Sequence, residues 1–75
     1  MIEVVCNTTQ DHAEATTPRG ALVAARTLIR DAVEAHPVQC YRPTCTFYVA
    51  GEPVPGLVNV SRQAVWFALG GGRMT

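Results

Sequence analysis

The sequence predicts a small α+β domain with the element order β-α-β-β-α. Residues 17–36 carry apolar residues at helical spacing between clear boundary residues. Short β-rich runs at 2–6, 45–50 and 54–60 surround this segment and are bounded by Gly, Pro and polar residues. A chain of 75 residues has room for one domain only. We therefore expect residues 1–75 to form a single three-stranded sheet with two helices on one face.

Residues 17–36 are expected to form an amphipathic helix. Thr17 can cap the free amides, Pro18 suits the first helical position, and Pro37 stops the helix. At about 100° per residue, one side carries the apolar stripe of Ala21, Leu22, Ala25, Leu28, Ile29, Ala32, Val33 and His36. The other side carries Arg26, Thr27, Arg30, Asp31 and Glu34. One helix cannot bury its own stripe, so the sheet must cover it.

The N-terminal run 2–6 is expected to be a strand with Ile2, Val4 and Cys6 on one face. The polar stretch 7–16 has no apolar period, so we expect a loop there that is mobile or binds a ligand.

After the helix, we expect a strand over 45–50, turn chemistry at 51–53 and a returning strand over 54–60. Cys45, Phe47 and Val49 share one face of the first of these strands. Ser61 can cap a short final helix over 62–69, which Gly70 ends, and 70–75 is expected to be a flexible tail.

A right-handed β-α-β crossover, with a hairpin returning between its two parallel strands, gives the strand order 1-3-2. This topology resembles the ferredoxin-like split β-α-β fold without its last strand, a likeness that implies no function. It would leave Ile2–Cys6 at a free sheet edge, which invites pairing with a second chain.

The composition favours self-association. Hydrophobic residues make up 48% of the chain and charged residues only 16%, which is apolar for so small a domain. We therefore expect a homo-oligomer, most simply a dimer. The formal net charge is zero, so no overall field attracts nucleic acid or an anionic membrane.

The sequence carries no set of catalytic residues, so we expect neither enzymatic activity nor a cofactor. All six basic residues are arginine, which excludes a Walker-type phosphate loop and a Schiff-base lysine. Nothing places Cys6, Cys40 or Cys45 beside a histidine base. The start lacks the pattern of a signal peptide or membrane span, so a cytoplasmic location with reduced thiols is expected.

The final helix is apolar on more than one side. Trp66 and Phe67 project away from the side formed by its other apolar residues, so one packing surface cannot cover both sets. Either the helix lies between the long helix and the sheet edge, or the two aromatic residues anchor a protein interface.

The open face of the expected sheet is also apolar, with Val5, Tyr48 and Leu57 among Glu3, Thr46 and Asn59. It suits self-association, or base stacking as in RNA-binding sheets, although it has no basic residue to hold phosphates. A separate arginine stripe, Arg19, Arg26 and Arg30, lies on the outer face of the long helix. It is either solvated or grips phosphates or an acidic partner.

His36, Cys40 and Cys45 are the residue types that bind tetrahedral zinc, with Cys6 or His12 as a fourth ligand. Their spacing lacks the paired knuckles of structural zinc sites, and cysteines are common in cores. We therefore keep a zinc-stapled module as an alternative only.

As a short, lysine-free α+β chain with an exposed aromatic helix and no catalytic set, the protein resembles the small early-region proteins of phages that infect high-GC bacteria. The resemblance implies an accessory protein that binds a host or phage protein. Our leading prediction is a homodimeric protein-binding module that uses Trp66 and Phe67, with Tyr48, Val5 and Leu57 as further contacts. The alternatives are a nucleic-acid-binding regulator using the arginine stripe and the zinc-stapled module.

Overall fold

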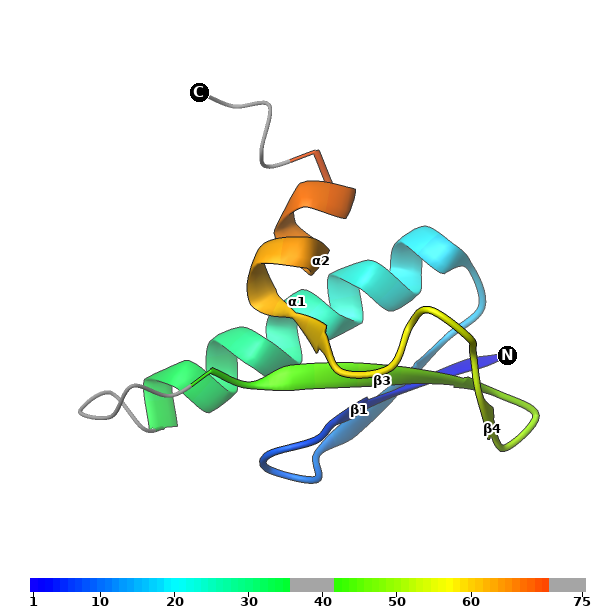
Figure 1. Cartoon of the computed structure of the whole chain (residues 1–75), viewed down its shortest axis with the longest axis horizontal. Helices are drawn as coiled ribbons and strands as arrows, with labels where there is room; N and C mark the ends of the chain where they lie inside the picture. Colours follow the sequence, from blue (N-terminus) through cyan, green and yellow to red (C-terminus); the bar gives the residue numbers. More distant parts are fainter. Residues whose placement is uncertain (36–41, 71–75) are drawn as a thin grey trace.

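The computed structural model describes residues 1–35 and 42–70 and packs two helices against one antiparallel sheet (Figure 1). The strands are β1 (Ile2–Cys6), β2 (His12–Ala15), β3 (Thr44–Val49), β4 (Glu52–Pro53) and β5 (Val60–Ser61). The helices are α1 (Pro18–Ala35) and α2 (Arg62–Ala68). The predicted α+β class is confirmed.

The strand order differs from the predicted one. The sheet has five strands in the order β2-β1-β3-β4, and β5 pairs with the other half of β3. The predicted order 1-3-2 placed the strand over 54–60 between those over 2–6 and 45–50, and it is wrong. In the structure β1 pairs directly and antiparallel with β3, with Cys6 opposite Cys45. The helical crossover therefore joins β2 to β3, and β1 lies between these two strands (Figure 1).

The stretch 7–16, predicted as a loop, forms a hairpin with β1. The N–H of Gln10 donates to the carbonyl of Cys6 over 2.8 Å and closes the turn, with a positive φ of 68° at Gln10. Along β2, His12 and Glu14 are exposed while Ala13 and Ala15 are half-buried. The outer edge that we expected at Ile2–Cys6 is therefore occupied, and β2 is the edge strand instead.

Helix α1 follows the prediction at its N-terminus and along its buried stripe. Thr17 Oγ1 accepts a hydrogen bond from the N–H of Gly20 at 3.0 Å and caps the helix. The buried residues of the stripe are Ala21, Ala25, Ile29 and Ala32. Three of these four are alanines, so α1 can approach the sheet closely. The predicted stripe residue His36 and the terminating Pro37 lie outside the described residues.

The predicted strand over 45–50 is confirmed as β3, but the returning strand is broken into two short pieces. Ala50 and Gly51, at φ values of 53° and 82°, form a two-residue turn between β3 and β4. Residues 54–57 interrupt the returning strand with a β-turn, in which the N–H of Leu57 donates to the carbonyl of Val54 at 2.9 Å and Gly56 adopts a φ of 84°. The N–H of Val54 and the carbonyl of Leu57 still bond to Phe47 of β3 on either side of this turn.

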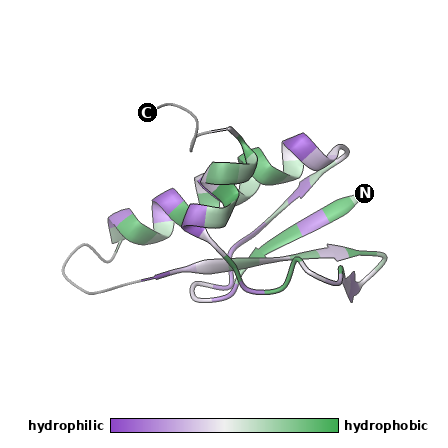
Figure 2. Cartoon of the chain, turned by 45° about the horizontal axis from the view of Figure 1, so that its top comes forward, coloured by the Kyte–Doolittle hydropathy of each residue, from purple (hydrophilic) through white to green (hydrophobic). Residues whose placement is uncertain are grey.

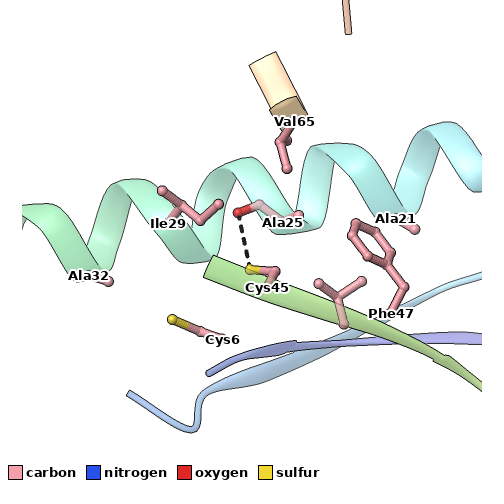
Figure 3. Packing of buried hydrophobic residues seen from close by; sticks show 9 residues of the cluster. Cys6, Ala21, Ala25, Ile29, Ala32, Cys45, Phe47 and Val65 are labelled. Carbon is pink, nitrogen blue, oxygen red and sulfur yellow. Dashed lines mark hydrogen bonds between the residues drawn. The ribbon is translucent and has the colours of Figure 1, made fainter. Parts of the chain in front are cut away.

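The core lies between the sheet and the two helices (Figure 3). It combines the alternate residues Val4, Cys6, Cys45 and Phe47 of the sheet with the α1 stripe and Val65 of α2. The opposite face of the sheet carries Glu3, Val5, Thr46 and Tyr48. The helices therefore cover one face only.

Candidate binding groove between the two helices

Helix α2 is held in place by its first turn and by one buried side chain. Ser61 Oγ accepts a hydrogen bond from the N–H of Ala64 at 3.1 Å, which confirms the predicted cap. Val65 is 1% exposed and packs onto α1 near Ala25 and Ile29 (Figure 3). Gly70, at a φ of 89°, follows the end of the helix. Because α2 is anchored on one side, its other sides remain open.

The two helices enclose a groove of about 440 Å³, which we call the interhelical groove. Helix α1 contributes Arg26, Ile29, Arg30, Val33 and Glu34, and helix α2 contributes Arg62, Val65 and Trp66. The aliphatic residues include the buried Ile29 and Val65, so the groove has an apolar base. Its size is within the range of small ligand pockets, and it can accept a side chain or a short segment of another molecule.

The interhelical groove carries positive charge. Three arginines line it, and Glu34 is its single acidic residue. Arg30 Nε lies 3.6 Å from Asp31 Oδ1, but both side chains are more than half exposed and such pairs contribute little. Within residues 1–35 and 42–70, neither Arg26 nor Arg62 has an acidic partner within 4.0 Å. Their guanidinium groups are available to bind a carboxylate or a phosphate.

The aromatic residues of α2 are exposed. Trp66 is 48% and Phe67 68% exposed, so neither belongs to the core. Leu57 and Val58, in the segment leading to β5, are also exposed. Figure 2 shows hydrophobic residues along α2 and in this preceding segment. The apolar surface therefore continues from the interhelical groove onto the outer side of α2.

The structure does not gather the five predicted interface residues on one surface. Trp66 and Phe67 lie on α2, in the helical layer of the molecule. Val5 and Tyr48 lie on the opposite, uncovered face of the sheet, where both are half-buried. Leu57 lies in the segment between β4 and β5. The predicted set therefore divides into two separate surfaces.

The arginine stripe divides as well. Arg26 and Arg30 line the interhelical groove, whereas Arg19 lies in the first turn of α1 and does not line it. Arg62 is a groove residue that the sequence analysis missed. The available signal was its spacing, since Arg62 precedes Trp66 by four positions and so shares one side of α2 with it.

A polar cluster occupies the uncovered face of the sheet. Thr46 is only 3% exposed and accepts a hydrogen bond from the N–H of Asn59 at 3.1 Å. Asn7 Nδ2 lies 2.9 Å from both Thr46 Oγ1 and Asn59 Oδ1, and 3.0 Å from Thr44 Oγ1. This face is therefore more polar at its centre than expected, which weakens the case for an apolar stacking platform.

Cys6 and Cys45 are free thiols in the core. Burial, with a further contribution from the adjacent Cys6, raises the pKa of the Cys45 thiol from 9.0 to about 12. Its Sγ is 3.9 Å from the carbonyl oxygen of Ala25, to which it donates (Figure 3). A thiol held in its neutral form is a poor nucleophile and a poor metal ligand.

The described part of the chain contains no group of three His, Cys, Asp or Glu side chains placed to hold a metal ion. Of the predicted zinc ligands, Cys45 faces the core, and His36 and Cys40 lie outside the described residues. His12 is exposed on the opposite face of the sheet from Cys6, so these two do not form a nucleophile and base pair.

The comparisons with known protein families, curated proteins and solved structures gave no significant match to this chain. No described helix is long and apolar enough to cross a lipid bilayer.

Proposed function

We propose that this protein is a small, non-enzymatic protein-binding module that regulates its partner and contacts it through the interhelical groove. The observation that carries the proposal is the meeting of Arg26, Arg30 and Arg62 with the half-exposed Trp66 around an apolar base. Tryptophan and arginine are the residues that contribute most to protein interfaces, especially where they surround a pocket.

The chemistry of the groove favours an acidic partner segment with a bulky apolar side chain. The arginines provide planar, bidentate donors for carboxylates. The aliphatic base and the indole ring provide a place for the apolar side chain. Phe67 lies next to Trp66 in the chain and extends the contact beyond the groove.

We further propose that the protein acts as an accessory protein of the phage type, binding a host or phage protein, and that it self-associates. Support for self-association comes from the large hydrophobic fraction of the chain. Two copies would present two grooves to the partner.

The binding test uses Trp66, the single tryptophan of the chain, as a fluorescent reporter. A short peptide rich in glutamate and leucine is titrated against the full chain, and its glutamine analogue serves as the reference ligand. We expect saturable quenching or a blue shift with the acidic peptide only. Because Arg19 lies outside the groove, Arg62→Gln should weaken binding about tenfold while Arg19→Gln should not. Equal effects of these two variants would contradict a groove-specific contact.

A second candidate function is binding of single-stranded nucleic acid. Guanidinium groups bind phosphates and an indole ring stacks on bases. The interhelical groove places three arginines beside Trp66. A single-stranded oligonucleotide in the same titration decides between the two functions. Tight binding that weakens steeply with salt would favour this second function over the first.

The zinc-stapled alternative is tested separately, by metal analysis of the purified protein and by unfolding in the presence of a chelator.

A further inference from the structure

The outer edge of β2 has a defined pattern of free backbone groups. Among the described residues, β2 pairs with β1 only. The N–H of Cys6 donates to the carbonyl of Asp11, and in an antiparallel ladder the bonded pairs then alternate along the strands. Ala13 and Ala15 therefore bond to β1, while His12 and Glu14 direct their N–H and carbonyl groups outward.

We propose that a second copy of this chain pairs with β2 in antiparallel fashion, with His12 of each copy opposite Glu14 of the other. The two copies are related by a two-fold axis through Ala13. This register uses every outward backbone group of both strands, because His12 and Glu14 then form a bonded pair on each side of the axis. Shifting the register by two positions towards the end of β2 places Glu14 opposite Glu14 of the second copy. Two carboxylates would then face each other.

The side chains favour the same register. His12 Nδ1 lies 3.8 Å from Glu3 Oε2 on the uncovered face, and Glu3 is directly opposite Glu14 in the β1–β2 ladder. The carboxylates of Glu3 and Glu14 therefore lie side by side, with the imidazole of His12 as their one basic neighbour within the strand pair. In the proposed pairing the imidazole of the second copy lies beside Glu14, so each carboxylate gains a histidine neighbour.

The helical layer allows the two copies to approach. Helix α1 lies over β1 and β2, and α2 lies beside it towards β3 and β5 (Figure 1). With strands about 4.8 Å apart, the α1 helices of the two copies would be roughly 10 Å apart, which is the spacing of packed helices. The flank of α1 that faces away from Arg26 and Arg30 carries Ala24, Leu28 and Ala35, with the exposed Asp31 at its outer side. Ala24 and Ala35 are small, and Leu28 is only half-buried in one copy, so this flank suits helix contact.

The pairing leaves the interhelical groove open, because the groove lies on the other flank of α1. The pairing therefore rests on the proposed self-association of the chain but not on its proposed partner binding. Self-association through β2 and partner binding through Trp66 are separable properties of the chain.

The test is sedimentation equilibrium of the full chain over a range of concentrations. We expect a dimer for the wild type and for Trp66→Ala, which leaves β2 unchanged. Glu14→Pro removes an outward N–H without touching the β1–β2 ladder, so it should give a monomer with an unchanged circular dichroism spectrum.

Two charge variants test the register and do not rely on proline. The acidic variant is His12→Glu, and the basic variant is His12→Lys with Glu14→Lys. Each variant alone places like charges opposite each other, so its dimer dissociation constant should rise by about tenfold or more. An equimolar mixture should restore dimers, because every facing pair is then oppositely charged.

The proposal is overturned by any of three results. The first is a wild type that sediments as a monomer at all concentrations. The second is a charge variant that dimerises as tightly as the wild type. The third is a dimer that Trp66→Ala splits, which would place the interface on α2 instead.

Discussion

Asn7 Nδ2 lies 2.9 Å from Asn59 Oδ1, 52 positions away, and so links the β1–β2 turn to the segment that leads into α2. Thr46 Oγ1 accepts a hydrogen bond from the backbone N–H of the same Asn59. The amide of Asn7 has only two protons for its three neighbouring oxygens, so the cluster depends on shared partners. A polar contact on the far face of the sheet therefore helps to hold the segment that leads into α2.

Replacing the buried hydroxyl of this cluster should destabilise the protein. Thr46→Val keeps the shape of the side chain but leaves the N–H of Asn59 without its acceptor, so we expect a loss of about 1–2 kcal/mol in the free energy of unfolding. Urea denaturation measures this loss. Thr44→Val is the matched control, because Thr44 is only half-buried and accepts from Asn7 alone. A Thr46 variant no less stable than the Thr44 variant would contradict the role of the cluster.

The stability of the protein should fall at high pH because of Cys45. Its pKa in the folded state, about 12, lies above the value of 9.0 expected for an unfolded thiol. Below pH 9 both states hold the proton and the contribution is fully present. As the pH rises from 9 towards 12, only the unfolded state releases it, so stability should fall by roughly 1.4 kcal/mol per pH unit.

The measurement for Cys45 is urea denaturation at several pH values between 8 and about 11. Cys45→Ala is the reference variant. It has no thiol at this position, so its free energy of unfolding should lack the fall with pH that Cys45 causes, whatever its stability at pH 8. Parallel pH profiles for the two proteins would show that Cys45 titrates equally in both states.

The turn between β3 and β4 contains an avoidable strain. Ala50 has a φ of 53°, a conformation that costs a residue with a Cβ atom roughly 1 kcal/mol and that asparagine tolerates better. Ala50→Asn should therefore raise the free energy of unfolding by roughly 0.5 kcal/mol, measured as an increase in Tm. Gly51→Ala provides the opposite control, because a Cβ at Gly51 meets no atom within 4 Å and adds only backbone strain. A lower Tm for Ala50→Asn would refute this account of the turn.

Residues of α2 should differ sharply in their contribution to stability. Val65 is buried and is the main contact of α2 with the core, so Val65→Ala should cost about 2 kcal/mol. Phe67 is mostly exposed, so Phe67→Ala should change stability by less than about 0.5 kcal/mol. Thermal unfolding of the two variants checks both values. A large loss with Phe67→Ala would mean that its ring packs within one copy or is covered by a second one.

Local signals in the sequence were sufficient for several elements. The capping residues Thr17 and Ser61, the stripe of α1 and the alternation in β1 and β3 all depend on neighbours within a few positions. These features agree with the prediction.

The strand β2 was missed because alanine and glutamate have low β propensity, although His12 to Ala15 alternates polar and apolar residues. Without β2, the crossover was assigned to the wrong pair of strands, and the sheet order followed that error. Antiparallel pairing of β1 with β3 is a contact between distant segments that no local pattern specifies.

The candidate site was predictable only in parts. Arg26, Arg30 and Trp66 were each recognised as binding residues, but they were assigned to separate hypotheses. The way α2 lies across α1 brings them together and adds Arg62. That crossing depends on the fit of Val65 against α1, which helical periodicity alone does not reveal.

The central place of β1 in the sheet has a consequence for synthesis of the chain. β1 leaves the ribosome shortly before β2 and can pair with it at once, since only a short turn separates them. Its other edge stays unpaired until residues 44–49 have been translated. During that interval Val4 and Cys6 have α1 as their only cover, and the nascent chain exposes an edge open to misplaced pairing.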